Sequence, residues 1–141
     1  MAPHVQVLRP SDAAVLDRVA PATFDGPIQP AWAHAFLADP RHRLAVAVED
    51  GWVVGFASGV QYFHPDKPPE LFIIEVGVSP AHQGRGIGTA VVEALLEEGR
   101  HLGCAQGWVL TSDDNGAALA LYRKAGGRAA PDPARLFEFF L

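Results

Sequence analysis

The order of apolar patterns along the chain predicts an α/β (α+β) fold, in which helices flank one mixed, mostly antiparallel sheet. Three observations support this class. Two apolar segments are joined by Asp50-Gly51, a pair that favours a tight antiparallel hairpin. The nearly continuous apolar segment Leu71–Val78 indicates a strand at the centre of a sheet. A glycine-rich turn then joins this strand to a segment with helical periodicity.

The N-terminal part is expected to form one strand and two helices. Residues 5–8 alternate as a short strand, and Ser11 can then cap a first helix that runs to Val19. A proline-rich loop follows at 21–30. The second helix is short, and helical spacing places Trp32, Ala35 and Phe36 on one face, where the two aromatic side chains are expected to serve the core.

The rest of the chain continues the sheet and adds two helices. Strands are expected at 44–49, 52–62 and 71–78, with a break at 64–69. The helix after the glycine-rich turn has one apolar face, which consists of Val92, Leu95, Leu96 and Gly99. A strand at 108–110, a helix at 117–124 and a final strand at 136–141 complete the order. No repeat or linker is visible, so we expect a single domain over residues 1–141.

The composition is that expected of a small cytoplasmic enzyme. Hydrophobic residues make up 49% of the chain, but no apolar run reaches membrane-spanning length and no signal-peptide pattern is present. The net charge of −5 argues against a nucleic-acid partner and is compatible with cationic ligands. The histidines and Cys104 lack the spacing of metal ligands, so no metal site is expected, and Cys104 is expected to serve packing.

The most informative segment is Val76–Thr89, which contains the glycine-rich turn. Glycines allow positive φ angles and close ligand approach, and the first N–H groups of a helix lack internal partners. The turn is therefore expected to hold a phosphate. No Gly-Lys-Ser/Thr follows the glycines, which excludes a P-loop, and Thr89 occupies the third glycine position of the dinucleotide fingerprint. A tight turn without a ligand is the structural alternative.

The spacing Gln83-x-x-Gly86-x-Gly88 resembles the Q/R-x-x-G-x-G/A loop of the GNAT (Gcn5-related) N-acetyltransferases. In that family the loop grips the pyrophosphate of acetyl-CoA, so the resemblance implies acetyl-CoA as co-substrate. The implied binding residues come from the end of the strand, the loop and the start of the helix: Val76, Gly77, Val78, Gln83, Gly84, Arg85, Gly86, Ile87, Gly88 and Thr89.

A second motif downstream strengthens the resemblance. The segment Asn115–Gly127 is similar to the N-x-x-A-x-x-L-Y-x-K-x-G-F pattern of the family, and it departs from that pattern at its end. Ala125 replaces the usual leucine, and Gly127 replaces the usual aromatic residue. Both positions follow Tyr122, so these departures concern the packing of the next strand more than the chemistry.

The resemblance also makes the predicted fold more specific. It implies the GNAT fold, with a sheet of about six to seven strands flanked by about four helices. The fourth and fifth strands, at 71–78 and 108–111, are implied to run parallel and to splay apart. Pantetheine would lie in the wedge between them and bond backbone groups near Val76 and Val78.

Attack of an amine on a thioester needs a base, donors for the oxyanion and a proton for the leaving thiolate. Glu75 is an acid on an apolar strand, so it is placed to act as the base, and partial burial would raise its pKa. The family places a tyrosine beside the sulfur, which implies this role for Tyr122. Backbone N–H of Val76 or Gly77 would bind the oxyanion, and Asn115 would cap the last helix or contact the cofactor. Purely structural roles for Glu75 and Tyr122 stay open.

For the acceptor, the chain resembles the type I aminoglycoside 3-N-acetyltransferases, although residues 111–113 depart from the stretch expected there. The resemblance implies a small cationic amine at the mouth of the wedge, held by Glu75, Asp113, Asp114 and Glu138. Three alternatives stay open: a housekeeping small-amine enzyme, a protein or peptide acetyltransferase that uses the loop at 63–70, and a non-catalytic acyl-CoA-binding module. The resemblance also allows a homodimer.

Overall fold

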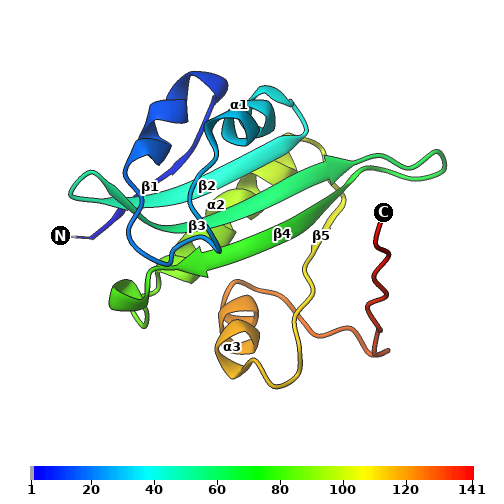
Figure 1. Ribbon diagram of the computed structural model, residues 1–141. Coiled ribbons are helices and arrows are strands. Elements are labelled where there is room, and N and C mark those ends of the chain that lie inside the picture. Colours follow the sequence, from blue (N-terminus) through cyan, green and yellow to red (C-terminus); the bar gives the residue numbers. More distant parts are fainter. Residues whose placement is uncertain (1) are drawn as a thin grey trace.

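The computed structural model describes residues 2–141, which form one mixed sheet with helices on both faces (Figure 1). The sheet has five strands in the order β1-β2-β3-β4-β5. They are β1 (His4–Val7), β2 (His42–Glu49), β3 (Trp52–Tyr62), β4 (Glu70–Val78) and β5 (Gln106–Trp108). Neighbouring strands are antiparallel except β4 and β5, which are parallel. The predicted class and the parallel fourth and fifth strands are confirmed, but the described chain forms five strands rather than six or seven.

The turn between β2 and β3 follows directly from its two residues. Asp50 and Gly51 have φ angles of 53° and 81°, and a type I′ hairpin turn requires positive φ at both positions. Glu49 and Trp52 face each other across the turn. The predicted hairpin is confirmed.

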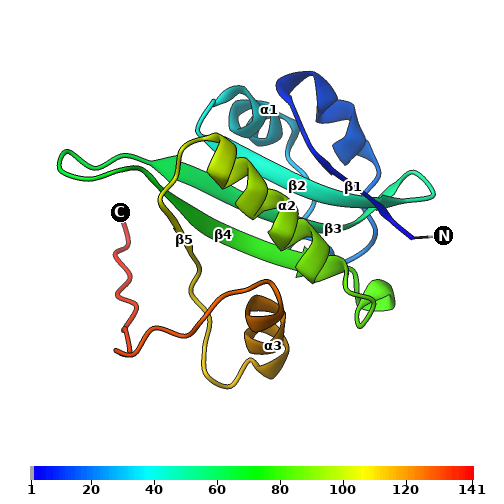
Figure 2. The same cartoon turned by 180° about the vertical axis from the view of Figure 1, so that it is seen from behind.

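Helices cover the two sides of the sheet with their apolar faces. Helix α2 (Ile87–His101) lies along one side (Figure 2), and its buried residues follow helical spacing: Ile87, Gly88, Val91, Val92, Leu95 and Gly99. The 3₁₀ helix η1 (Pro10–Asp17) and α1 (Pro30–Ala38) cover the other side. A short 3₁₀ turn, η2 (Pro80–His82), precedes α2, and α3 (Gly116–Lys124) packs against α2. None of the helices within residues 2–141 combines the length and the apolar character of a membrane-spanning segment.

The predicted cap and end of the first helix are wrong. A proline takes the first helical position, so Arg9 is the N-cap. The backbone N–H of Arg9 donates to the carboxylate of Asp12 at 2.7 Å, and Ser11 does not cap the helix. The element is a 3₁₀ helix that ends at Asp17, short of the expected Val19.

The face that α1 turns to the core also differs in part from the prediction. Leu37 is buried, and Ala33 and Phe36 pack against the same core. These three positions share one face at helical spacing. Trp32 falls outside that face and is 76% exposed, and Ala35 is exposed as well. The predicted core role is therefore wrong for Trp32 and right for Phe36.

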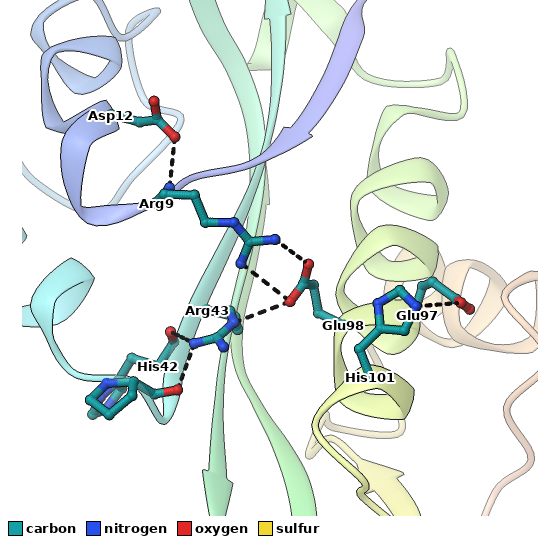
Figure 3. Close-up of polar contacts among 8 residues, drawn as sticks. Arg9, Asp12, His42, Arg43, Glu97, Glu98 and His101 are labelled. Carbon is teal, nitrogen blue, oxygen red and sulfur yellow. Dashed lines mark hydrogen bonds and ion pairs between the residues drawn. The ribbon is translucent and has the colours of Figure 1, made fainter.

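A cluster of charged side chains ties α2 to β2 and to the start of η1 (Figure 3). Glu98 on α2 accepts hydrogen bonds from Arg9 at 2.9 Å and from Arg43 at 3.1 Å. Burial alone would raise the pKa of Glu98, but the two arginines hold this pKa below its usual value. Glu98 therefore stays charged, and the cluster fixes the helix whose opposite end carries the glycine loop.

The last strand of the sheet is short and lies earlier than expected. β5 covers Gln106–Trp108 rather than residues 108–111, and it pairs with β4 only from Glu70 to Phe72. The indole of Trp108 packs on Phe72, and its N–H donates to the hydroxyl of Tyr62 at 2.5 Å. These contacts anchor β5 at the beginning of β4, after which the two strands separate.

The predicted strand at 136–141 is wrong. This segment has no strand partner in the described chain, and its large apolar side chains are exposed, from 76% for Leu136 to 118% for Leu141. An apolar run forms a strand only where a neighbouring edge offers backbone partners, and β5 ends at Trp108. The segment instead runs irregularly on the β5 side of the molecule (red in Figure 1).

Candidate active site

The second half of β4 has an open edge. Because β5 pairs only with Glu70–Phe72, residues 73–78 have β3 on one side and no strand on the other within residues 2–141. Backbone N–H and C=O groups along such an edge are available to an extended ligand. The open edge ends at Val78, directly before the segment that leads into the glycine loop. The predicted separation of the fourth and fifth strands is present.

The glycine loop shapes the N-terminus of α2 for an anion. Gly84 and Gly86 have φ angles of +76° and +80°, and a Cβ at either position would meet no atom within 4 Å. Gly86 is the N-cap and offers no side chain, and the first helical hydrogen bond runs from Ala90 N–H to the Gly86 carbonyl at 3.1 Å. The N–H groups of residues 87–89 therefore lack helical partners. Together with the helix dipole they form a cradle for a diphosphate.

Gly88 has a role of its own at the start of α2. It is buried, and a Cβ at this position would collide with the side chain of Leu121 on α3. The missing side chain therefore lets α3 pack closely on α2. This contact sets the position of the helix that carries Tyr122.

Side chains of the loop are braced within the protein. Arg85 donates to the Glu49 carboxylate at the end of β2 at 3.0 and 3.3 Å, and the hydrogen bond with Arg85 lowers the pKa of Glu49. His82 lies 3.4 Å from the same carboxylate. Gln83 donates to the Val78 carbonyl at 3.4 Å. The loop is therefore held against the β2–β3 hairpin, and its backbone N–H groups remain the donors open to a ligand.

A β-bulge sets the direction of Glu75. The register of β3 and β4 shifts between the pair Ser58–Glu75 and the pair Gly59–Ile73, so Ile74 is the extra residue. In a regular strand, Glu75 would point to the same side as Ile73, which is buried in the core under α2. The bulge turns Glu75 to the opposite side of the sheet, where η1 and α1 lie.

The loop between η1 and α1 covers β4 on that side. A Cβ on Gly77 would collide with the Thr23 carbonyl oxygen and the Phe56 ring, so the backbone of the loop lies directly against β4. Phe24 stacks on Phe56 with ring centroids 3.8 Å apart. Residues 19–28 line a cavity of about 320 Å³. This loop brings Asp25 to the site.

Asp25 is a site residue that the sequence analysis missed. Its loop reaches the side of β4 to which Glu75 points, because the Thr23 carbonyl, two residues before Asp25, lies against Gly77, two residues after Glu75. Glu75 as a whole is exposed, but its carboxyl group is partly shielded, and this burial together with the charge of Asp25 raises the pKa of Glu75. The raised pKa agrees with the expectation. The second carboxylate left no signal in the sequence, because a single acid in an irregular, proline-rich loop follows no periodic pattern.

Helix α3 brings Tyr122 to the core beneath the end of β4. Asn115 caps this helix, and its side-chain oxygen accepts from Ala118 N–H at 3.1 Å. Tyr122 packs against the core cluster that Val76 and Val78 also contact, and burial raises the pKa of its phenol. The phenol therefore keeps its proton at neutral pH. The capping role of Asn115 is confirmed, while its contact with the cofactor stays a prediction.

The other acids predicted to hold the acceptor are not gathered around Glu75. Asp113 and Asp114 are exposed on the turn before α3, and Glu138 is exposed on the C-terminal segment. Within residues 2–141, no ion pair or hydrogen bond joins any of them to Glu75. Their role at the entrance of the site stays a prediction.

Cys104 lies between α2 and β5 and is partly buried against the core. Burial, and then the charge of Glu70, raise the pKa of its thiol, which disfavours the reactive thiolate. The packing role expected for Cys104 agrees with this environment. In the described part of the chain, no three His, Cys, Asp or Glu side chains are grouped to hold a metal ion.

An open strand edge beside an anion-binding helix N-terminus is the class of site that can receive an extended, diphosphate-bearing molecule. The profile of the Acetyltransferase (GNAT) family matches residues 13–127. The chain belongs to this family, as its glycine loop and its last helix predicted. The matched range contains Asp25, Glu75, the glycine loop and Tyr122.

Curated relatives are named for different substrates. N-alpha-acetyltransferase RimI of Mycobacterium tuberculosis (strain ATCC 25618 / H37Rv) is 40% identical over 105 residues, which cover 72% of this chain and 62% of the relative. L-2,4-diaminobutyric acid acetyltransferase of Nocardia farcinica (strain IFM 10152) is 36% identical over 92 residues, or 62% of this chain and 47% of the relative. The chain thus spans about half the length of these relatives.

Solved structures share the fold over nearly the whole chain. The aminoglycoside acetyltransferase HMB0005 from an uncultured soil metagenomic sample has a TM-score of 0.80 at 25% identity, and the likeness covers 100% of this chain and 99% of that one. The aminoglycoside acetyltransferase meta-AAC0020, also from an uncultured soil metagenomic sample and in complex with sisomicin, has a TM-score of 0.79 at 17% identity. This likeness covers 98% of this chain and 96% of that one. At that identity the second likeness shows the fold alone.

Proposed function

We propose that this chain transfers the acetyl group of acetyl-CoA to a primary amine of a small cationic acceptor, by direct attack in a ternary complex. The open edge of β4 at residues 73–78 carries the proposal, because it connects the glycine loop to the strand position of Glu75. A non-catalytic acyl-CoA-binding module would need neither Glu75 nor Tyr122, and the chain has both. GNAT family membership supports acetyl-CoA as the acetyl donor.

The residues present fit acetyl-CoA. The unpaired N–H groups of residues 87–89 suit its diphosphate, and the open space at Gly86 lets that group approach the helix end. Backbone groups of Val76 and Val78 suit the amides of pantetheine, as an added strand would. When bound, acetyl-CoA supplies a thioester whose acetyl group can pass to an amine.

The chain's own residues cover each chemical demand of the transfer. Glu75 takes a proton from the acceptor ammonium and leaves a neutral amine that can attack the thioester carbonyl carbon. Its raised pKa brings its basicity closer to that of the amine. Backbone N–H of Val76 or Gly77 donates to the carbonyl oxygen as charge develops there. Tyr122 donates its phenol proton, or a hydrogen bond, to the sulfur as the new C–N bond forms and the C–S bond breaks. The second proton that the amine nitrogen loses on becoming an amide passes to the resulting phenolate or thiolate.

An aminoglycoside amine, acetylated as in the 3-N type, is our first candidate acceptor. The net charge of −5 and the pair of Glu75 with Asp25 favour a cation. Asp113, Asp114 and Glu138 are exposed acids that can add to this attraction at the entrance. The full-length likeness to aminoglycoside acetyltransferase HMB0005 also supports an aminoglycoside as the acceptor.

The amine of a protein or peptide N-terminus is a second candidate. The 40% identity to RimI over 72% of this chain favours it. The loop between β3 and β4 extends beyond the sheet, and its Phe63 is 64% exposed, so it offers an apolar contact to a longer acceptor. A peptide acceptor would use the same Glu75 and Tyr122.

A panel of acceptors tests the proposal. Aminoglycosides, polyamines, amino acids and peptides are each incubated with acetyl-CoA, and free thiol release is recorded. We expect thiol release with a polycation, and KM for it should rise with ionic strength, because each partly exposed charge contact is worth only about 1 kcal/mol and is screened by salt. Asp113→Asn combined with Asp114→Asn should raise KM in the same way at nearly constant kcat. A neutral amine as best acceptor, with KM unaffected by salt, would contradict the cationic acceptor.

Replacement of one glycine tests the cofactor site. Gly86→Ala should weaken acetyl-CoA binding about tenfold to a hundredfold, because a changed loop loses charge-assisted bonds to the diphosphate. Gly103→Ala is the matched control, since Gly103 has φ +79°, equally open space and a place at the other end of α2. Calorimetric titration with acetyl-CoA measures both variants. Equal affinity of Gly86→Ala and the control would remove the loop from the site.

A further inference from the structure

The loop at 20–28 is held in one shape over β4. Thr23 is 4% exposed, and its hydroxyl donates to the Ala20 carbonyl at 2.7 Å. Ala22 takes a φ of 59°, which non-glycine residues seldom adopt and which neighbouring contacts must enforce. The stack of Phe24 on Phe56 fixes the residue directly before Asp25. Asp25 is therefore an exposed acid on a firmly held backbone.

The strand neighbours of Glu75 are uncharged. Ser58, opposite on β3, is neutral, and the strand neighbours Ile74 and Val76 are apolar. The contacts of Thr23 with Gly77 and of Phe24 with Phe56 bring Asp25 to this side of β4, and Asp25 lines a cavity of about 320 Å³ formed by residues 19–28 of its loop. The charge of Asp25 adds to the effect of burial in raising the pKa of Glu75. Two carboxylates so placed repel each other when both are ionised. A cation between them would turn that repulsion into two attractions.

We propose that Asp25 is an acceptor-binding residue, which together with Glu75 clamps the ammonium form of the acceptor amine before Glu75 takes the proton. This assignment rests on the proposed acetyltransferase function and makes its acceptor more specific. An ammonium group has several N–H donors, so it can bond both carboxylates at once. Asp25 then holds the acceptor, while Glu75 takes the proton.

The clamp also selects against one class of amine. A carboxylate next to the reacting amine would face both Asp25 and Glu75 and be repelled. Acceptors in which the groups next to the reacting amine are cationic or neutral, such as polyamines and aminosugars, are accepted instead. An α-amino acid should therefore be a poor acceptor at its α-amine.

Asp25→Asn tests the assignment with the best acceptor found in the panel. KM for this acceptor should rise roughly tenfold, the size of one partly exposed charge contact, while KM for acetyl-CoA stays unchanged. The acidic limb of kcat/KM should also move to lower pH, because the pKa of Glu75 falls when the neighbouring negative charge is removed. Asp25→Glu should restore much of the acceptor affinity. Asp66→Asn, in the exposed loop between β3 and β4, controls for the change in net charge.

The outcomes separate this assignment from the proposed function. A panel without any acceptor would overturn both. An acceptor whose KM and pH profile are the same for Asp25→Asn and the wild type would overturn the role of Asp25 alone. Loss of acetyl-CoA binding in Asp25→Asn would also overturn it, because Asp25 would then act on the shape of the site and not on the acceptor.

Discussion

Glu75→Gln is expected to lower kcat at neutral pH by about a hundredfold to ten-thousandfold, the usual contribution of a positioned base. The amide keeps the size of the side chain but cannot take a proton from the acceptor. Activity should recover in part as pH rises, because free amine then accumulates without help from the enzyme. The wild type should lose activity as pH falls through the raised pKa of Glu75, since the protonated acid is no longer a base. Stopped-time assays of thiol release across pH measure both effects.

Glu93→Gln provides the matched control. Glu93 is an exposed acid on α2, on the side of the helix turned away from the sheet. This variant removes the same charge and should keep the kcat and the pH profile of the wild type. Acetyl-CoA affinity should be unchanged in both variants. If Glu75→Gln turns over as fast as the control, Glu75 has only a structural role.

Tyr122→Phe is expected to lower kcat by about a hundredfold or more, the lower range for a general acid. The phenylalanine ring keeps the packing against the core, so folding and acetyl-CoA affinity should change little. The raised pKa of Tyr122 means that the wild type holds its proton through neutral pH. The loss should therefore be nearly constant with pH, unlike the loss in Glu75→Gln.

Tyr62→Phe separates this effect from a general loss of hydroxyl groups. Tyr62 lies on β3 opposite Glu70, the first residue of β4, and its hydroxyl accepts a hydrogen bond from the Trp108 indole. Its replacement should weaken the anchor of β5 and lower the free energy of unfolding by about 1 kcal/mol, with kcat nearly unchanged. A Tyr122→Phe enzyme with full kcat would remove the phenol from the chemistry.

Local sequence signals predicted the parts of the fold that local chemistry determines. Asp50-Gly51 specified its turn, because few other residues accept positive φ at both positions. In the same way, the continuous apolar run predicted the central strand β4, and the glycines predicted the turn before α2. The last strand was mispredicted, because hydrophobicity at 136–141 says nothing about whether a sheet edge lies nearby.

The geometry of the site depended on contacts that the sequence does not display. Glu75 was found because it is the one acid within an apolar strand, but the bulge at Ile74 exists only in the pairing with β3. Asp25 was missed because its importance arises from the approach of its loop to Gly77. The absence of a side chain at Gly77 permits that approach, but the sequence alone does not show which backbone segment lies there.

Transfer of a labelled acetyl group tests the central claim most directly. Acetyl-CoA labelled in its acetyl group is incubated with the protein alone and with the best amine of the panel, and the label is located by mass spectrometry of the protein and of the amine. Direct attack in a ternary complex predicts an unlabelled protein without the amine, and label on the amine nitrogen when it is present. Label retained on the protein, for example at Cys104, or an amine that never acquires label, would contradict the account.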